Sequence, residues 1–172
     1  MFDLTKLDWL NGHYLRELGD GEFTERLVAF ATAQRGLDEA VVPTLRLGAP
    51  LVRERVQTLG QAVDMLMFTV LDDADFVVDE AAAAKQLGEK GAPALSAALP
   101  ALEALADWSS AAIEDALRTA LVDGLGLKPR NAFGPLRVAL TGSTVSPPLF
   151  ESMEILGRER SLARLRAASV PS

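Results

Sequence analysis

Apolar residues recur at three- and four-residue spacing along most of the chain, which is the pattern of amphipathic helices. The first such segment covers residues 5–18, where Leu4, Leu7, Leu10 and Tyr14 mark one face. We therefore expect the chain to open with a helix.

The same spacing, broken by glycines and prolines, continues toward the other end. Thr24 is the expected N-cap of the second helix and Gly36 its expected stop. Gly48 and Pro50 are expected to interrupt the helical pattern. Beyond 5–18, the pattern predicts helices over residues 24–35, 38–46, 79–87, 93–106, 110–123 and 135–140. It also predicts a helical segment that contains Arg53 and Arg55, and a last helical stretch over 147–168 that Gly157 breaks.

Residues 65–71 are almost all apolar. Periodicity cannot distinguish a buried helix from a strand in so short a run, but the helical neighbours favour a helix. An acidic turn follows at residues 72–75. We place a subdomain boundary here, which predicts an N-terminal helical subdomain over 1–66 and a C-terminal one over 67–172.

The composition supports helices throughout. Ala and Leu, the strongest helix formers, account for 55 of the 172 residues. The expected fold is an all-α, two-part helical bundle with a smaller N-terminal and a larger C-terminal part. The absence of cysteine excludes disulfides and thiolate metal sites. No apolar run approaches the roughly 20 residues that cross a bilayer, so we expect no membrane segment.

The net charge of −7 is spread unevenly. Residues 1–60 carry net −2, residues 61–127 net −9, and residues 128–172 net +4. A polyanion would avoid the middle of the chain and favour the end, although a solvated basic terminal helix would show the same pattern. Arginine outnumbers lysine 13 to 4, and its planar fork suits base edges and phosphates.

The sequence shows no self-contained catalytic site. Its only histidine is His13, and no Gly-rich phosphate loop is present. The acids between Asp72 and Glu80 would suit a divalent metal, or equally a solvated loop and helix cap. Three functions are therefore weighed: an RNA-reading module, a helical protein-interaction module that binds a partner helix, and a metal-dependent hydrolase that uses these acids. For this chain itself we expect no catalytic residue, metal or cofactor.

Several separated motifs decide among these functions. The run FDLTKLDWLNGHYLR at residues 2–16 resembles the segment that follows the catalytic domain in bacterial glutamyl-tRNA synthetases. PLRVALTG at 135–142, LFE at 149–151 and LGRER at 156–160 are similar to the C-terminal signature of that family. Arg-Glu-Arg at 53–55 falls between them in the expected order, so the resemblance covers essentially the whole chain.

The resemblance implies the C-terminal anticodon-binding region of a class I aminoacyl-tRNA synthetase. This family activates glutamate with ATP and transfers it to tRNA, and its C-terminal half is an α-helical cage of two subdomains that grips the anticodon. The chain lacks the two ATP-site motifs of the family, so we expect it to be inactive alone, with ATP and Mg²⁺ bound in the separate catalytic domain. The expected partners are glutamate-accepting tRNA and that catalytic domain, in a cytoplasmic, monomeric enzyme.

The resemblance also assigns residues. Arg55 matches the arginine that reads the third anticodon base, Arg137 the one that approaches the first, and Ser146 with Pro147 the loop beside the middle base. From the residues alone, a serine followed by proline predicts the N-cap and first position of a helix, whose positive dipole end suits a polyanion. An ion pair with a neighbouring acid is the alternative for Arg55, and an ordinary helix cap for Ser146. The expected phosphate contacts are Arg53, Lys128, Arg130, Arg158 and Arg160.

Two positions depart from the family pattern. Gly134 stands where many members carry a polar residue, which puts a side-chain contact to a base in question there. Pro148 stands where glycine is common, which stiffens the loop. Trp9 and Trp108 are expected in the core, with a stacking platform for a base as the alternative.

Overall fold

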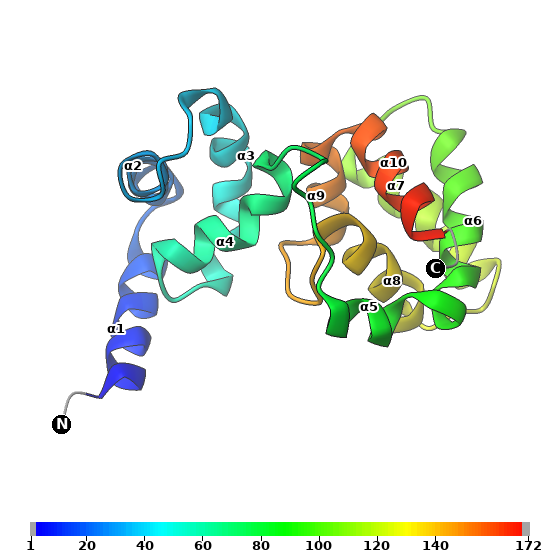
Figure 1. The fold of residues 1–172 in the computed structure, drawn as a ribbon, viewed down its shortest axis with the longest axis horizontal. Helices are drawn as coiled ribbons and strands as arrows, with labels where there is room; N and C mark the ends of the chain where they lie inside the picture. The colour runs from blue at the N-terminus through cyan, green and yellow to red at the C-terminus, as the bar shows by residue number, and fades with distance from the viewer. Residues whose placement is uncertain (1–2, 170–172) are drawn as a thin grey trace. The chain divides into compact units, whose positions relative to one another are not determined.

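The computed structural model describes residues 3–169 and is helical throughout (Figure 1). This part of the chain forms ten α-helices, α1 to α10, joined by short 3-10 and π-helical turns, and contains no strand. The all-α prediction is confirmed. None of the helices in the described range is long and apolar enough to cross a membrane.

The chain divides into two compact units, Met1–Val70 and Leu71–Ser172. The predicted boundary after residue 66 falls inside α4 (Leu59–Val70). The apolar run that could have been helix or strand is the end of this helix, and the acidic segment after it forms a turn in which the Asp75 amide donates to the Asp72 carbonyl.

The first unit contains α1 (Leu4–Glu17), α2 (Asp20–Arg35), α3 (Val42–Val52) and α4. The second of these packs on both α3 and α4. Burying their apolar faces together removes the side chains from water and supplies the main stabilising term. The largest fully buried side chains of this unit are Phe23, Leu27, Leu45 and Leu66.

One of the two predicted ends of the second helix is wrong, and the other is confirmed. The predicted N-cap Thr24 lies inside α2, where its hydroxyl donates to the Asp20 carbonyl. The helix starts at Asp20, and the acids in its first turn suit the positive end of the helix dipole. The predicted stop is confirmed, because Gly36 adopts the left-handed conformation with φ 64°.

The predicted break at Gly48 and Pro50 is also wrong, since α3 continues through both. A Cβ atom at Gly48 would lie 2.5 Å from Leu66 Cδ2. Glycine is needed here because α4 approaches the α3 backbone closely. The break signal in the sequence thus reflects packing between two helices and not the end of one.

The described part of the second unit contains six α-helices, which Figure 1 labels α5 to α10. They are α5 (Glu80–Gln86), α6 (Ala92–Glu103), α7 (Ser110–Leu117), α8 (Pro129–Thr141), α9 (Leu149–Leu156) and α10 (Arg158–Ser169). A π-helical turn, Arg118–Asp123, extends α7. The eighth helix contacts α5, α6 and α10. Its central place in the unit makes α8 a rigid base for a site. The largest fully buried side chains of this unit are Leu95, Leu102, Ile113, Leu117, Leu121, Leu136, Leu140 and Met153.

Helix α8 begins at Pro129 and not near Pro135 as predicted. Lys128 has an extended backbone, and proline suits the first helical position because the amide hydrogen it lacks would have no partner there. Pro135 lies inside the helix, which ends at Gly142 in the left-handed conformation. The earlier start adds almost two turns, and these turns carry the candidate site.

The prediction that both tryptophans are core residues is wrong for Trp9. Its side chain is 58% exposed and stacks on His13. Leu4, Leu10 and Tyr14 on the same helix are also exposed, so the apolar face of α1 is uncovered within the described residues. Trp108 is half-buried, and its Nε1 donates to the Met153 carbonyl at 3.0 Å.

Candidate nucleic-acid interface

One face of α8 forms the floor of a small pocket of about 270 Å³. The floor residues follow one another at helical spacing along the first three turns. Gln86, at the end of α5, and Thr144, in the loop after α8, complete the wall. The floor residues are Pro129, Arg130, Phe133, Gly134 and Arg137.

Arg137 joins this pocket to the loop before α9. Its Nη1 donates to Ser146 Oγ at 2.5 Å and to the Pro147 carbonyl at 3.1 Å. Ser146 Oγ in turn donates to the Pro147 carbonyl at 2.8 Å. Three of the four residues expected to contact the anticodon are therefore linked by hydrogen bonds.

The predicted capping role of Ser146 is wrong. Helix α9 begins at Leu149, Pro148 is the flanking residue, and no side chain caps its first turn. Ser146 and Pro147 are buried beneath Arg137 and lie before the helix instead of in it. The pair of prolines holds the loop extended, so the helix starts two residues later than the serine–proline signal predicts.

An aromatic pair supports the other side of the pocket floor. Phe133 and Phe150 meet edge to face with their ring centroids 5.4 Å apart. The Arg118 guanidinium lies 5.6 Å from the Phe133 centroid and pairs with Glu114. These contacts fix the ring that borders the pocket. Phe133 was not among the predicted site residues, because the predicted helix began only at Pro135 and left Phe133 outside it.

Arg55 lies in the first unit, in a 3-10 turn (Arg53–Arg55) after α3. Its side chain is exposed and makes no hydrogen bond or ion pair with any other described residue. The predicted alternative, an ion pair with a neighbouring acid, is not formed. Arg55 is thus available to a ligand at the surface of this unit.

Arg53, in the same turn, is committed to the fold. Its Nη1 donates to the carbonyls of Arg16 and Leu18, and its Nε pairs with Asp20 at 2.8 Å. These bonds tie the end of α1 to the start of α2. Arg55, not Arg53, is the cation of this turn that faces solvent.

The other expected phosphate contacts fall into two groups. Arg158 donates to the carbonyls of Glu103 and Leu105, and Arg160 donates to the Leu71 carbonyl and pairs with Asp73. Lys128 and Arg130 are exposed and have no such partner among residues 3–169. They stand at the first turn of α8, where helix dipole and side-chain charge both favour an anion.

The acids between Asp72 and Glu80 do not gather into a metal site. Within residues 3–169, no three acids or histidines lie close enough together to hold a metal ion. Asp79 caps α5, since its carboxylate accepts from the Ala82 amide at 2.8 Å. Asp73 pairs with Arg160 and Arg164. The described residues therefore give no support to a metal-dependent hydrolase that uses these acids.

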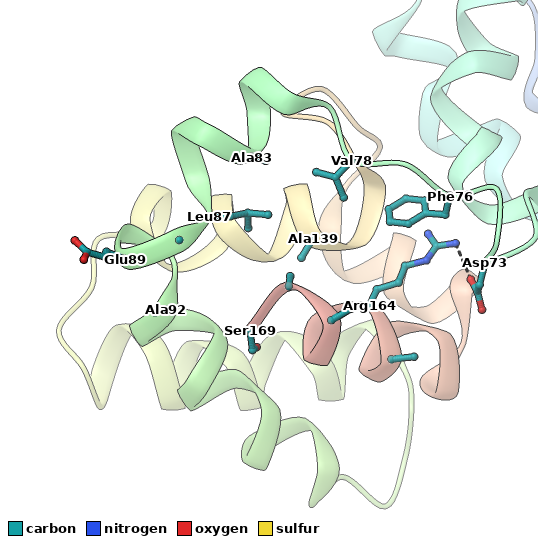
Figure 2. A pocket seen from close by; sticks show the side chains of 14 residues that line it. Asp73, Phe76, Val78, Ala83, Leu87, Glu89, Ala92, Ala139, Arg164 and Ser169 are labelled. Carbon is teal, nitrogen blue, oxygen red and sulfur yellow. Dashed lines mark hydrogen bonds and ion pairs between the residues drawn. The ribbon is translucent and has the colours of Figure 1, made fainter. Parts of the chain in front are cut away.

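Figure 2 shows Asp73 and Arg164 at one end of a larger cavity of about 1060 Å³, with Phe76 beside them. The hydrogen bond from Arg160, reinforced by Arg164, holds the pKa of Asp73 below its ordinary value. Burial lowers the pKa of Arg164. Its guanidinium lies 3.7 Å from the Phe76 ring centroid and donates to the Leu140 carbonyl. This ion pair anchors α10 in the unit.

The fold and the pocket define an all-helical binding domain with a cationic pocket on one helix. The family model described as "Anticodon binding domain" matches residues 22–169, and the chain belongs to this family. The chain is 54% identical to the glutamate–tRNA ligase of Acidothermus cellulolyticus over 98% of its length, and 52% identical to that of Rhodococcus jostii over 97%. It spans about a third of the length of these relatives, 34% in each case.

Two solved structures share the fold. A glutamate tRNA ligase from Elizabethkingia meningosepticum aligns with a TM-score of 0.76 at 20% identity. The glutamate-tRNA synthetase from Elizabethkingia anophelis aligns with a TM-score of 0.75 at 21% identity. Each match covers 98% of this chain and 32% of the solved chain. At 20–21% sequence identity, the similarity to these two structures shows a shared fold and nothing further.

Proposed function

We propose that this chain binds the anticodon loop of a glutamate-accepting tRNA, as the anticodon-reading part of a glutamate–tRNA ligase. The observation that carries the proposal is the α8 pocket, in which Arg130 and Arg137 converge beside the loop that Arg137 holds. Arginine forks and an aromatic ring are the groups that proteins use to hold splayed single-stranded bases.

The proposed roles separate reading from positioning. Arg137 approaches the first anticodon base, and Ser146 with Pro147 shapes the surface beside the middle base. Arg55, exposed on the first unit, reads the third base. Lys128 and Arg130 neutralise phosphates at the start of α8. Each base-reading arginine supplies about 1–3 kcal/mol of discrimination.

The chemistry of the whole enzyme belongs to the rest of the protein. In the proposed enzyme, a separate catalytic domain binds ATP and Mg²⁺, activates glutamate and transfers it to the tRNA. The proposed enzyme is a cytoplasmic monomer, and the 172-residue chain alone does not aminoacylate tRNA.

The test is binding of the chain to an RNA hairpin that carries the anticodon loop of glutamate tRNA, compared with hairpins changed at each anticodon base. Binding is measured at two salt concentrations. We expect preference for the cognate loop and weaker binding at the higher salt, because phosphate contacts release counterions. Equal binding to every hairpin would leave only a basic surface.

The competing function is a helical protein-interaction module. The observation in its favour is the larger, mainly apolar cavity among α5, α8 and α10 (Figure 2). That function predicts that the chain ignores the hairpins at low salt. Selective hairpin binding that the Arg137→Ala variant abolishes would reject it.

A further inference from the structure

The side-chain amide of Gln86 lies directly over the backbone of Gly134. A Cβ atom at Gly134 would be 2.5 Å from Gln86 Oε1, 3.0 Å from its Cδ and 3.4 Å from its Nε2. Real Cβ atoms do not approach other atoms as closely as the first of these distances. The amide of Gln86 therefore occupies the space that any side chain at position 134 would take.

This amide borders the same pocket as Arg130 and Arg137. Gln86 is half-buried at the last turn of α5, and its side chain makes no hydrogen bond with any described residue. An amide carries two donor hydrogens and an acceptor oxygen. Gln86 thus brings unused hydrogen-bonding groups of both kinds to a pocket wall.

The two arginines of the pocket offer donors only. Donors alone favour a base edge that is rich in acceptors, but they cannot require a donor on the base. An amide beside them adds a donor and an acceptor in one plane, which match an edge that presents a donor next to an acceptor. Such a combination distinguishes bases that arginine alone would accept.

We infer that Gln86 is a specificity-determining residue whose amide reads the edge of the base that enters the α8 pocket. This inference rests on the proposed function, in which that base is the first of the anticodon. Gly134 contributes to this role, because the absence of a side chain at position 134 leaves room for the Gln86 amide at the pocket wall.

Three variants test the inference by independent routes. Gln86→Ala removes the amide, and Gln86→Met keeps the length and the packing over Gly134 but carries no hydrogen-bonding amide. Gly134→Ala displaces the amide without altering Gln86, and the fold tolerates it because only the far end of a flexible side chain must move. Gln34→Ala, at an exposed glutamine of α2, is the matched control.

The measured quantity is the affinity for the cognate hairpin divided by the affinity for hairpins that are changed at the first anticodon base. Thermal unfolding is recorded for every variant. We expect both Gln86 variants and Gly134→Ala to reduce this ratio by about tenfold, the size of one base contact. Gln34→Ala should keep the ratio of the unaltered chain.

An unchanged ratio in all three variants would overturn the inference. So would a ratio lowered in Gln86→Ala and retained in Gln86→Met, because packing and not the amide would then be responsible. If the unaltered chain binds all hairpins equally, the proposed function itself fails, and this outcome is distinct from the other two.

Discussion

Arg137 combines two tasks, since the residue proposed to read a base also holds the loop beside it. Arg137→Ala should weaken cognate hairpin binding by about 1–3 kcal/mol and remove the preference for the first base. Competition binding with hairpins changed at that base measures both effects. Arg46→Ala, at an exposed arginine of α3 that pairs with Glu25, is the matched control and should keep the preference of the unaltered chain. If the Arg137→Ala variant kept the preference for the first anticodon base, Arg137 would only hold the loop before α9 and would not read the base.

Asp73 makes the stability of the second unit depend on pH. Its pKa is lowered in the folded chain by hydrogen bonds from Arg160 and Arg164. A carboxyl group with a lowered folded pKa stabilises the fold above its unfolded pKa, near 3.9, and this contribution is lost as the pH falls through the folded pKa. Asp73→Asn should therefore destabilise the chain at neutral pH by at most about 1 kcal/mol, because the Asp73 side chain is 55% exposed and solvent screens its ion pairs.

The measurement is thermal unfolding of the Asp73→Asn variant and the unaltered chain from pH 7 down to pH 2. The difference in melting temperature should be constant at neutral pH and shrink as the pH falls below 4. Glu89→Gln, at an exposed acid at the other end of the same cavity, is the control and should show no comparable difference. A difference for Asp73→Asn that stays constant to pH 2 would contradict the assignment.

At the same scale, some residues of the α8 pocket were predictable from the sequence and others were not. Arg130, Arg137 and the Ser146–Pro147 loop were identified because they lie in or near a motif. Gln86 and Thr144 belong to other segments and join the pocket only through the packing of α5 and the loop on α8. Residue type gave no signal for them, because an isolated glutamine or threonine is ordinary on a helical surface.

At the scale of the elements, helix content was predictable while several boundaries were not. Glycine and proline predict helix boundaries, yet Pro50 and Pro135 lie inside helices. Proline removes one hydrogen bond from a helix, and burial of the apolar face around it offsets that loss. The final glycines Gly36 and Gly142 were predictable, since both adopt the left-handed conformation that ends a helix.

Gly48 gives the clearest test of how packing overrides a local signal. Gly48→Ala should lower the free energy of unfolding by about 1–3 kcal/mol, because the added methyl group would meet the buried Leu66 at 2.5 Å. Urea unfolding measures the change. Gly21→Ala is the matched control, since nothing lies within 4 Å of a Cβ there and the helix gains up to about 1 kcal/mol. If both variants had the same free energy of unfolding, α3 and α4 would accommodate the added methyl group without a loss of stability.

At the scale of the whole molecule, the net charge of −7 is a poor guide to where an anion binds. The +4 of residues 128–172 includes Arg158, Arg160 and Arg164, which are bonded to carbonyls and acids of their own unit. Such cations hold helices together and offer little to a ligand. Lys128 and Arg130 differ, because the start of α8 leaves them exposed. The sequence alone does not distinguish arginines that hold the fold together from arginines that are exposed to a ligand. The hydrogen bonds and ion pairs of the structure make this distinction.

This division predicts different responses to salt. Lys128→Ala should weaken binding to every hairpin alike and lower the slope of log affinity against log salt by about 0.7, the value for one phosphate contact on a single strand. Arg158→Ala should instead lower the melting temperature, since it leaves the Glu103 and Leu105 carbonyls without their donor, and should keep the slope of the unaltered chain. Titrations at four salt concentrations, together with thermal unfolding, separate the two effects. A lowered slope with an unchanged melting temperature for Arg158→Ala would mean that the terminal arginines contact RNA directly, and that the basic surface extends beyond the α8 pocket.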